Sequence, residues 1–116
     1  MDHFRSPRHA GRVERPNGSA FVRGSDDNRF IEIQVCLQKG VIDQIAFGTY
    51  GCAPAIACGS WACEWAAGRP AVQVGELTAH MVLEGLGGLP PHREEHAHLT
   101  VQALQAAVSQ ALQDRS

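Results

Sequence analysis

Cys52 is the residue whose setting points most directly to chemistry. It stands between a strand-like run and an apolar run that begins at Pro54, so we expect it beside the first turn of a helix. The first N–H groups of a helix lack intrahelical partners and carry the positive end of the helix dipole, which stabilises a thiolate. The sequence therefore predicts a reactive thiol for metal or sulfur chemistry. The alternative is a small buried side chain, as free cysteines often are.

Two polar segments could supply further ligands. His92 and His96 are four residues apart at the start of the last expected helix, so they would share a face and could bind zinc or iron. A histidine-rich helix start is nevertheless more often solvated. Asp27 lies in the polar turn 25–28 and could offer a hard oxygen ligand, although Ser, Asp and Asn are also ordinary turn formers.

The other three cysteines have no expected site role. Cys58 and Cys63 lie inside the apolar run, where a thiol usually serves as a small hydrophobic side chain, and Cys36 ends a strand. Neither Cys52 and Cys58 nor Cys58 and Cys63 have the Cys-x-x-Cys spacing of a metal knuckle. We therefore interpret Cys58 and Cys63 as core residues.

Length and composition favour a single globular domain that spans residues 1–116. The chain is 44% apolar and 19% charged with a formal net charge of -2, a balance that demands neither nucleic acid nor an anionic membrane as partner. No apolar run is long enough to span a bilayer, and the start lacks the apolar core of a signal peptide. We expect a cytoplasmic protein with reduced cysteines.

The hydrophobic pattern predicts strands followed by helices. Period-two alternation marks a strand over 30–35, with a shorter strand at 19–23 and a return strand at 41–47 after the turn 38–40. A buried helix is expected over 54–67, ended by Gly68, and a shorter helix over 74–86. The last helix should bury a face formed by Val101, Leu104, Val108 and Leu112. This order predicts an α+β fold, a small antiparallel sheet of about three strands with helices packed on one face.

Four short motifs, in residues 2–11, 45–57, 64–69 and 89–91, together resemble those of the NifU-like or IscU-type iron-sulfur cluster scaffold family. Residues 2–11 are similar to the family's opening His-Phe-x-Asn-Pro-Arg-Asn-x-Gly, and residues 45–57 resemble the loop that carries its second cysteine ligand. Residues 64–69 look like its Glu-Trp-Val-x-Gly-Lys stretch. Leu89-Pro90-Pro91 sits where the family has the Leu-Pro-Pro recognised by a dedicated Hsp70 chaperone.

The resemblance implies a site made of three cysteines and an aspartate, of which this chain keeps a part. Asp27 and Cys52 match the family's aspartate and second cysteine, whereas Ser25 stands at the first cysteine. His96 stands at the third cysteine and Glu95 at the histidine before it. Asp27, Cys52, His96 and Glu95 would form a mixed set of oxygen, sulfur and nitrogen ligands that suits zinc or ferrous iron. Histidine also replaces cysteine in Rieske [2Fe-2S] centres.

The resemblance implies a non-enzymatic scaffold or carrier for iron-sulfur clusters. A cysteine desulfurase would deliver sulfur to Cys52 as a persulfide, iron would bind beside it, and the [2Fe-2S] cluster or iron would pass to an apo-protein. Ser25 and His96 favour an alternative, a degenerate scaffold fold that binds one Zn or Fe ion or acts as an interaction module. A hydrolase using Asp27, Cys52 and His96 is a third hypothesis, without an oxyanion-forming motif to support it.

Overall fold

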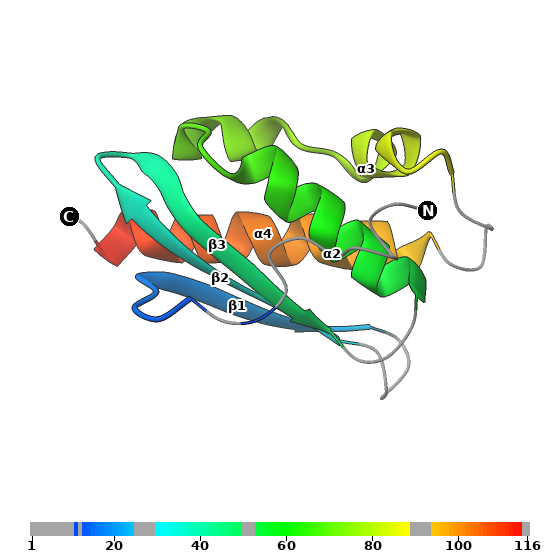
Figure 1. Cartoon of the computed structure of the whole chain (residues 1–116), viewed down its shortest axis with the longest axis horizontal. Helices are drawn as coiled ribbons and strands as arrows, with labels where there is room; N and C mark the ends of the chain where they lie inside the picture. The colour runs from blue at the N-terminus through cyan, green and yellow to red at the C-terminus, as the bar shows by residue number, and fades with distance from the viewer. Residues whose placement is uncertain (1–10, 12, 25–29, 50–52, 89–93, 115–116) are drawn as a thin grey trace.

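The computed structural model describes residues 11, 13–24, 30–49, 53–88 and 94–114, and its elements form one sheet with helices on one side (Figure 1). The sheet is an antiparallel meander in the order β1-β2-β3. Its strands are β1 (Gly18–Arg23), β2 (Phe30–Gln38) and β3 (Val41–Thr49). The three predicted strands are confirmed, and β2 and β3 run further than the alternation indicated.

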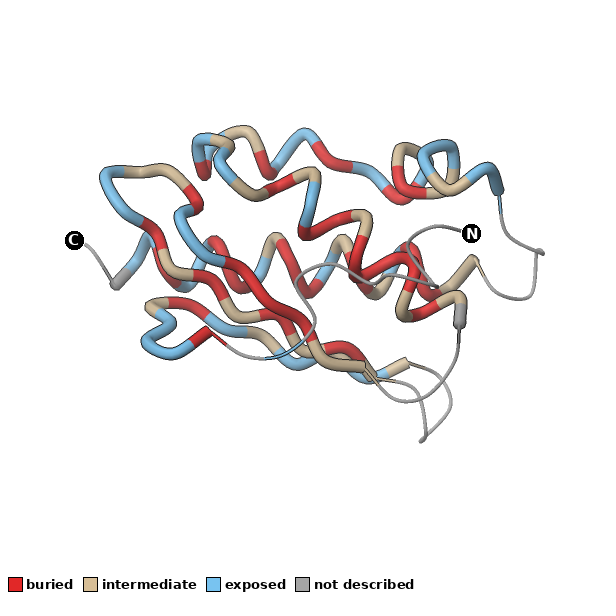
Figure 2. The backbone as a smooth tube through the Cα atoms, viewed as in Figure 1, coloured by how far each residue is buried: buried red, intermediate tan, exposed pale blue. Residues whose placement is uncertain are grey.

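Alternation along β2 explains which side of the sheet the helices cover. Ile31, Ile33, Val35 and Leu37 are buried, whereas the residues between them are half-buried. Because successive side chains of a strand point to opposite faces, the buried set defines the inner face of the sheet and the remainder its outer face. In Figure 2 the buried positions gather between the strands and the helices.

The β2–β3 hairpin turns at Lys39 and Gly40, as predicted. Their φ angles are 55° and 78°, so both central residues of the two-residue turn adopt the left-handed region. This combination characterises the tight turns whose twist matches that of paired strands, and glycine reaches it without steric cost. The paired register shifts once, between Cys36 and Leu37, which leaves Asp43 as the extra residue of a bulge on β3.

Helices α2 (Ala53–Ala66) and α4 (Glu95–Asp114) cover the inner face. Helix α2 packs against β3 and α4, whereas α4 packs against β1 and β2. Gly68 follows the end of α2 with a φ of 82°, which confirms the predicted helix end. No helix in the described ranges is both long and apolar enough to cross a membrane.

The prediction of a single helix over residues 74–86 is wrong. The chain forms a 3-10 helix, η1 (Ala71–Glu76), and a separate α-helix, α3 (Ala79–Gly85). Leu77 between them is extended, with φ -70° and ψ 135°, and the Thr78 hydroxyl accepts a 3.2 Å hydrogen bond from the Met81 N–H. A capping threonine starts a new helix at this point, a signal that the apolar spacing does not reveal.

The predicted inner face of α4 is correct only in its middle. Leu104 and Val108 are buried, but Val101 is half-buried and Leu112 is 40% exposed. The buried stripe consists mainly of small residues, namely Ala97, Thr100, Ala103, Ala107 and Ala111. Small side chains are required because β1 approaches closely, to the extent that a Cβ atom on Gly18 would collide with the carbonyl oxygen of Ala107.

Candidate functional site

The described ends of five elements meet at one end of the sheet. Arg23 pairs with Phe30, and Ile31 pairs with Thr49, so the end of β1, the start of β2 and the end of β3 lie together. The starts of α2 and α4 lie at this same end in Figure 1. We call it the site end of the sheet, because the predicted ligands follow or precede these element ends in the sequence.

A side-chain hydrogen bond fastens two of these ends. The Thr49 hydroxyl donates to the carbonyl oxygen of Phe30 at 2.6 Å. Phe30 directly follows the segment that contains Asp27, and Thr49 precedes the segment that contains Cys52. Sequence reasoning missed Thr49, because strand alternation and turn residues do not indicate a side-chain bond to a backbone carbonyl oxygen.

His96, at the second position of α4, is the predicted ligand that the structure describes most fully. It is 4% exposed, and its carbonyl oxygen accepts a 2.7 Å hydrogen bond from the Thr100 hydroxyl. Glu95 is half-buried, whereas His98 is exposed. The solvated alternative for this histidine-rich helix start therefore fits His98 but not His96, whose position on the inner face of α4 withdraws it from water.

The other predicted ligands lie outside the described residues. These are Asp27 and Cys52, together with Ser25, His92 and the Leu89-Pro90-Pro91 segment. Their roles in the site stay predictions. Within the part of the chain that the structure describes, no three histidine, cysteine or acidic side chains gather as a metal site.

Cys58 and Cys63 are core residues, as predicted, because both are fully buried on α2. Burial raises the pKa of the Cys63 thiol far above its ordinary value of 9.0, since a thiolate there would lose its hydration. A thiol held protonated is a poor metal ligand and a poor nucleophile. Cys63 is therefore unsuited to the chemistry expected of Cys52.

Comparison with known proteins adds a match over almost the whole chain. The model of the NifU-like N terminal domain matches residues 1–115. The chain belongs to the NifU-like N-terminal domain family. This finding confirms the resemblance that the sequence motifs indicated.

Relatives in this family carry explicit names. Two proteins of Archaeoglobus fulgidus, each named iron-sulfur cluster assembly scaffold protein IscU, are 35% identical over 93% of this chain and 71% of their own length. The protein of that name from Aquifex aeolicus is 33% identical over 97% of this chain and 73% of its own length.

Solved structures agree on the fold. A NifU-like protein (N-terminal) from Brucella abortus superposes with a TM-score of 0.76 at 16% identity, covering 97% of this chain and 91% of that chain. A putative iron-sulfur cluster assembly scaffold for the SUF system from Fervidobacterium islandicum gives a TM-score of 0.73, also at 16% identity, with 93% and 92% covered. The predicted α+β fold, a three-stranded antiparallel sheet with helices, is confirmed.

Proposed function

We propose that this chain is a scaffold or carrier for iron-sulfur cluster assembly, which receives iron and sulfur at the site end of the sheet. The observation that carries the proposal is the family match over residues 1–115, whose named relatives are assembly scaffolds. The proposed ligands are Asp27, Cys52 and His96, with Glu95 as a further carboxylate. The cargo is iron or a [2Fe-2S] cluster, and the chain acts as a scaffold and not as an enzyme.

The position of His96 supports this ligand set. A nearly buried imidazole at the start of α4 stands one helical turn before Thr100, whose hydroxyl bonds to the carbonyl oxygen of His96. Burial holds the ring in a fixed environment and limits the access of water, both of which suit a metal ligand. Imidazole nitrogen, thiolate sulfur and carboxylate oxygen together fit ferrous iron and zinc.

Anaerobic reconstitution with iron and sulfide tests the proposal. We expect sulfur-to-iron charge-transfer absorbance that is lost in the Cys52→Ala variant and strongly reduced in His96→Ala. His98→Ala is the matched control, because His98 is exposed on the same helix two residues away. Absence of the absorbance in fully reduced wild-type protein would contradict cluster assembly.

A variant that restores the family's cysteines tests the framework of the site. The double substitution Ser25→Cys and His96→Cys should strengthen cluster binding, because thiolate is a far better iron ligand than a serine hydroxyl. Loss of all cluster binding in that variant, with unchanged far-UV circular dichroism, would count against the ligand positions proposed here.

Ser25 and His96, at positions where the family has cysteines, favour a second candidate function. In that case the chain binds one Zn or Fe ion without assembling a cluster, or serves as an interaction module. Metal and acid-labile sulfide analysis of the purified protein separates the two candidates. One zinc without sulfide, released by the Cys52→Ser substitution, would support the second.

The proposed partners follow from the scaffold role. A cysteine desulfurase would transfer sulfur to Cys52 as a persulfide, and apo-proteins would accept the cluster. Leu89-Pro90-Pro91 is the proposed binding segment for an Hsp70-type chaperone. We place the protein in the cytoplasm as a single domain over residues 1–116. A pull-down with the desulfurase, with and without the Cys52→Ala substitution, tests the first of these contacts.

A further inference from the structure

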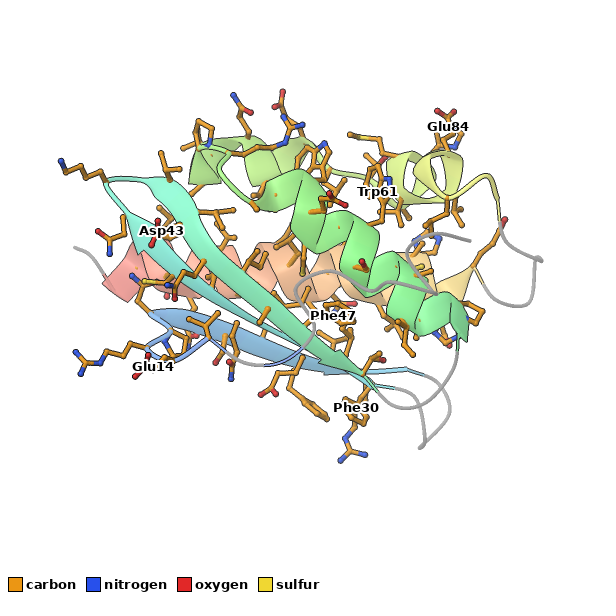
Figure 3. All side chains as sticks on the ribbon, in the orientation of Figure 1. Glu14, Phe30, Asp43, Phe47, Trp61 and Glu84 are labelled. Atoms are coloured by element: carbon orange, nitrogen blue, oxygen red, sulfur yellow. The ribbon has the colours of Figure 1, made fainter. Side chains whose placement is uncertain are left out.

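An aromatic pair lies on the outer face of the sheet. The rings of Phe21 and Phe30 stack with their centroids 5.0 Å apart and an interplanar angle of 18°. Phe21 is 50% exposed, and the Arg23 guanidinium lies 5.5 Å from the centre of its ring. Figure 3 shows Phe30 on the side of the sheet opposite to α2 and α4. These three residues form what we call the aromatic patch.

The patch lies on an open strand edge. Within the described ranges β1 pairs only with β2, and at its start the Ser19 N–H donates outward to Oε1 of Gln110 at 2.6 Å. Because backbone groups alternate in direction along an antiparallel strand, the N–H and C=O of Phe21 and Arg23 also point away from β2. Among the described residues, no partner like Gln110 caps this second half of the edge.

Charge indicates what this edge would bind. Arg23 is exposed and has no ion pair within the described ranges. Glu32 shares the outer face but belongs to β2, so a strand added beside β1 would lie about 10 Å from the Glu32 backbone, two strand spacings away. Among the described residues of β1 and β2, an acidic strand would therefore meet Arg23 before it met a like charge.

We propose that the edge of β1 from Phe21 to Arg23 docks an extended acidic segment of a partner protein, which adds to the sheet as a fourth strand. Open strand edges bind extended peptides through their backbone groups, while side-chain contacts select among them. Here the Phe21 ring supplies apolar area and Arg23 a carboxylate contact. The docked segment lies at the site end, because Arg23 and Phe30 flank the segment that contains Asp27.

Fluorescence anisotropy with a defined probe tests the proposal on metal-free protein, so the result is independent of cluster binding. The probe is a labelled seven-residue peptide in which aspartate alternates with valine and threonine. At low ionic strength we expect Arg23→Glu to weaken binding about fivefold, which is within the effect on affinity of losing an exposed ion pair. Lys39→Glu is the control with the same change of charge, in the turn at the opposite end of β2.

Amide hydrogen exchange locates the bound peptide. The amide protons of Phe21 and Arg23 should exchange more slowly in the complex, and a peptide with proline at its centre should not protect them, because it lacks a strand donor. Equal weakening by Arg23→Glu and Lys39→Glu, protection confined to other amides, or no binding at about 1 mM peptide would overturn the proposal. A dimer seen by sedimentation that Arg23→Glu dissociates would overturn it in favour of a second copy of the chain.

Discussion

The hydroxyl of Thr49 and the carbonyl oxygen of Phe30 are joined by a 2.6 Å hydrogen bond between the last residue of β3 and the first residue of β2. The bond crosses from one strand to its neighbour at the point where both chains leave the sheet. It therefore limits how far the two strands can separate at the site end, next to the segments that contain Asp27 and Cys52.

Replacing Thr49 with valine should lower the free energy of unfolding by about 1–2 kcal/mol. Valine keeps the shape and strand preference of threonine but removes the hydroxyl that donates to the Phe30 carbonyl oxygen. Urea unfolding followed by circular dichroism measures the change. Thr49→Ser retains the hydroxyl and should lose less, so an equal loss in both variants would show that the hydrogen bond is unimportant.

The close approach of β1 to α4 predicts that Gly18→Ala is strongly destabilising. The added Cβ would overlap with the backbone of Ala107 and Ala111, which cannot move without shifting the helix. We expect a loss of about 2–3 kcal/mol, at the upper end for overpacking by one methyl group. Gly75→Ala is the control, since no atom lies near the position of its Cβ. A stability change below about 0.5 kcal/mol for Gly18→Ala would contradict this packing.

Gln105 joins η1 to α4 and should be sensitive to substitution. Its Nε2 donates to the carbonyl oxygens of Val74 and Leu77 at 3.2 Å and 3.0 Å. Leucine has a similar size but cannot donate, so Gln105→Leu removes this donor from the Leu77 carbonyl oxygen, whereas the Val74 carbonyl oxygen keeps the Leu77 N–H. The substitution should cost about 1–3 kcal/mol. The same change at the exposed Gln102 should be nearly neutral by thermal unfolding. Similar melting temperatures for the two variants would be evidence against the bridge.

Burial of the Cys63 thiol predicts a loss of stability in alkali. Its folded pKa is raised above the ordinary 9.0, so its contribution is fully present below pH 9.0 and falls above it, where only the unfolded chain releases the proton. From roughly pH 8 to pH 10.5 this effect amounts to about 2 kcal/mol. Cys63→Ala should therefore lose less stability over that range than wild type, as measured by urea unfolding at each pH. Parallel pH profiles would show that Cys63 does not titrate between the two states.

The sequence predicted the meander and the two long helices because their signals are local. Period-two alternation marks β2, and Gly68 marks the end of α2. The break between η1 and α3 was missed, because it depends on the Thr78 cap and not on the spacing of apolar residues. The inner face of α4 was misplaced because the proximity of Gly18 to Ala107, far apart in the sequence, decides which side chains fit.

The candidate site likewise combines features that the sequence motifs indicate and features that depend on contacts between distant residues. Motif similarity selected Asp27, Cys52 and His96 without any knowledge of distances, and the burial of His96 emerged only from the packing of α4. The bulge at Asp43 shifts the register of β3 by one residue, so that Thr49 pairs with Ile31 and not with Phe30. A one-residue shift moves every side chain to the opposite face, so pairing by the turn alone would have misplaced Thr49.

The meander topology affects the order in which the elements can fold during translation. Each strand pairs with its neighbour in the chain, whereas β1 is covered by α4, which follows the other described elements in the sequence. During translation the hairpins can form early, because their loops are short and cheap in entropy to close. The inner surface of β1 therefore stays without α4 on the ribosome until the 20 residues of that helix have emerged. Because His96 belongs to that helix, we expect the nascent chain to gain this proposed ligand only after α4 has emerged.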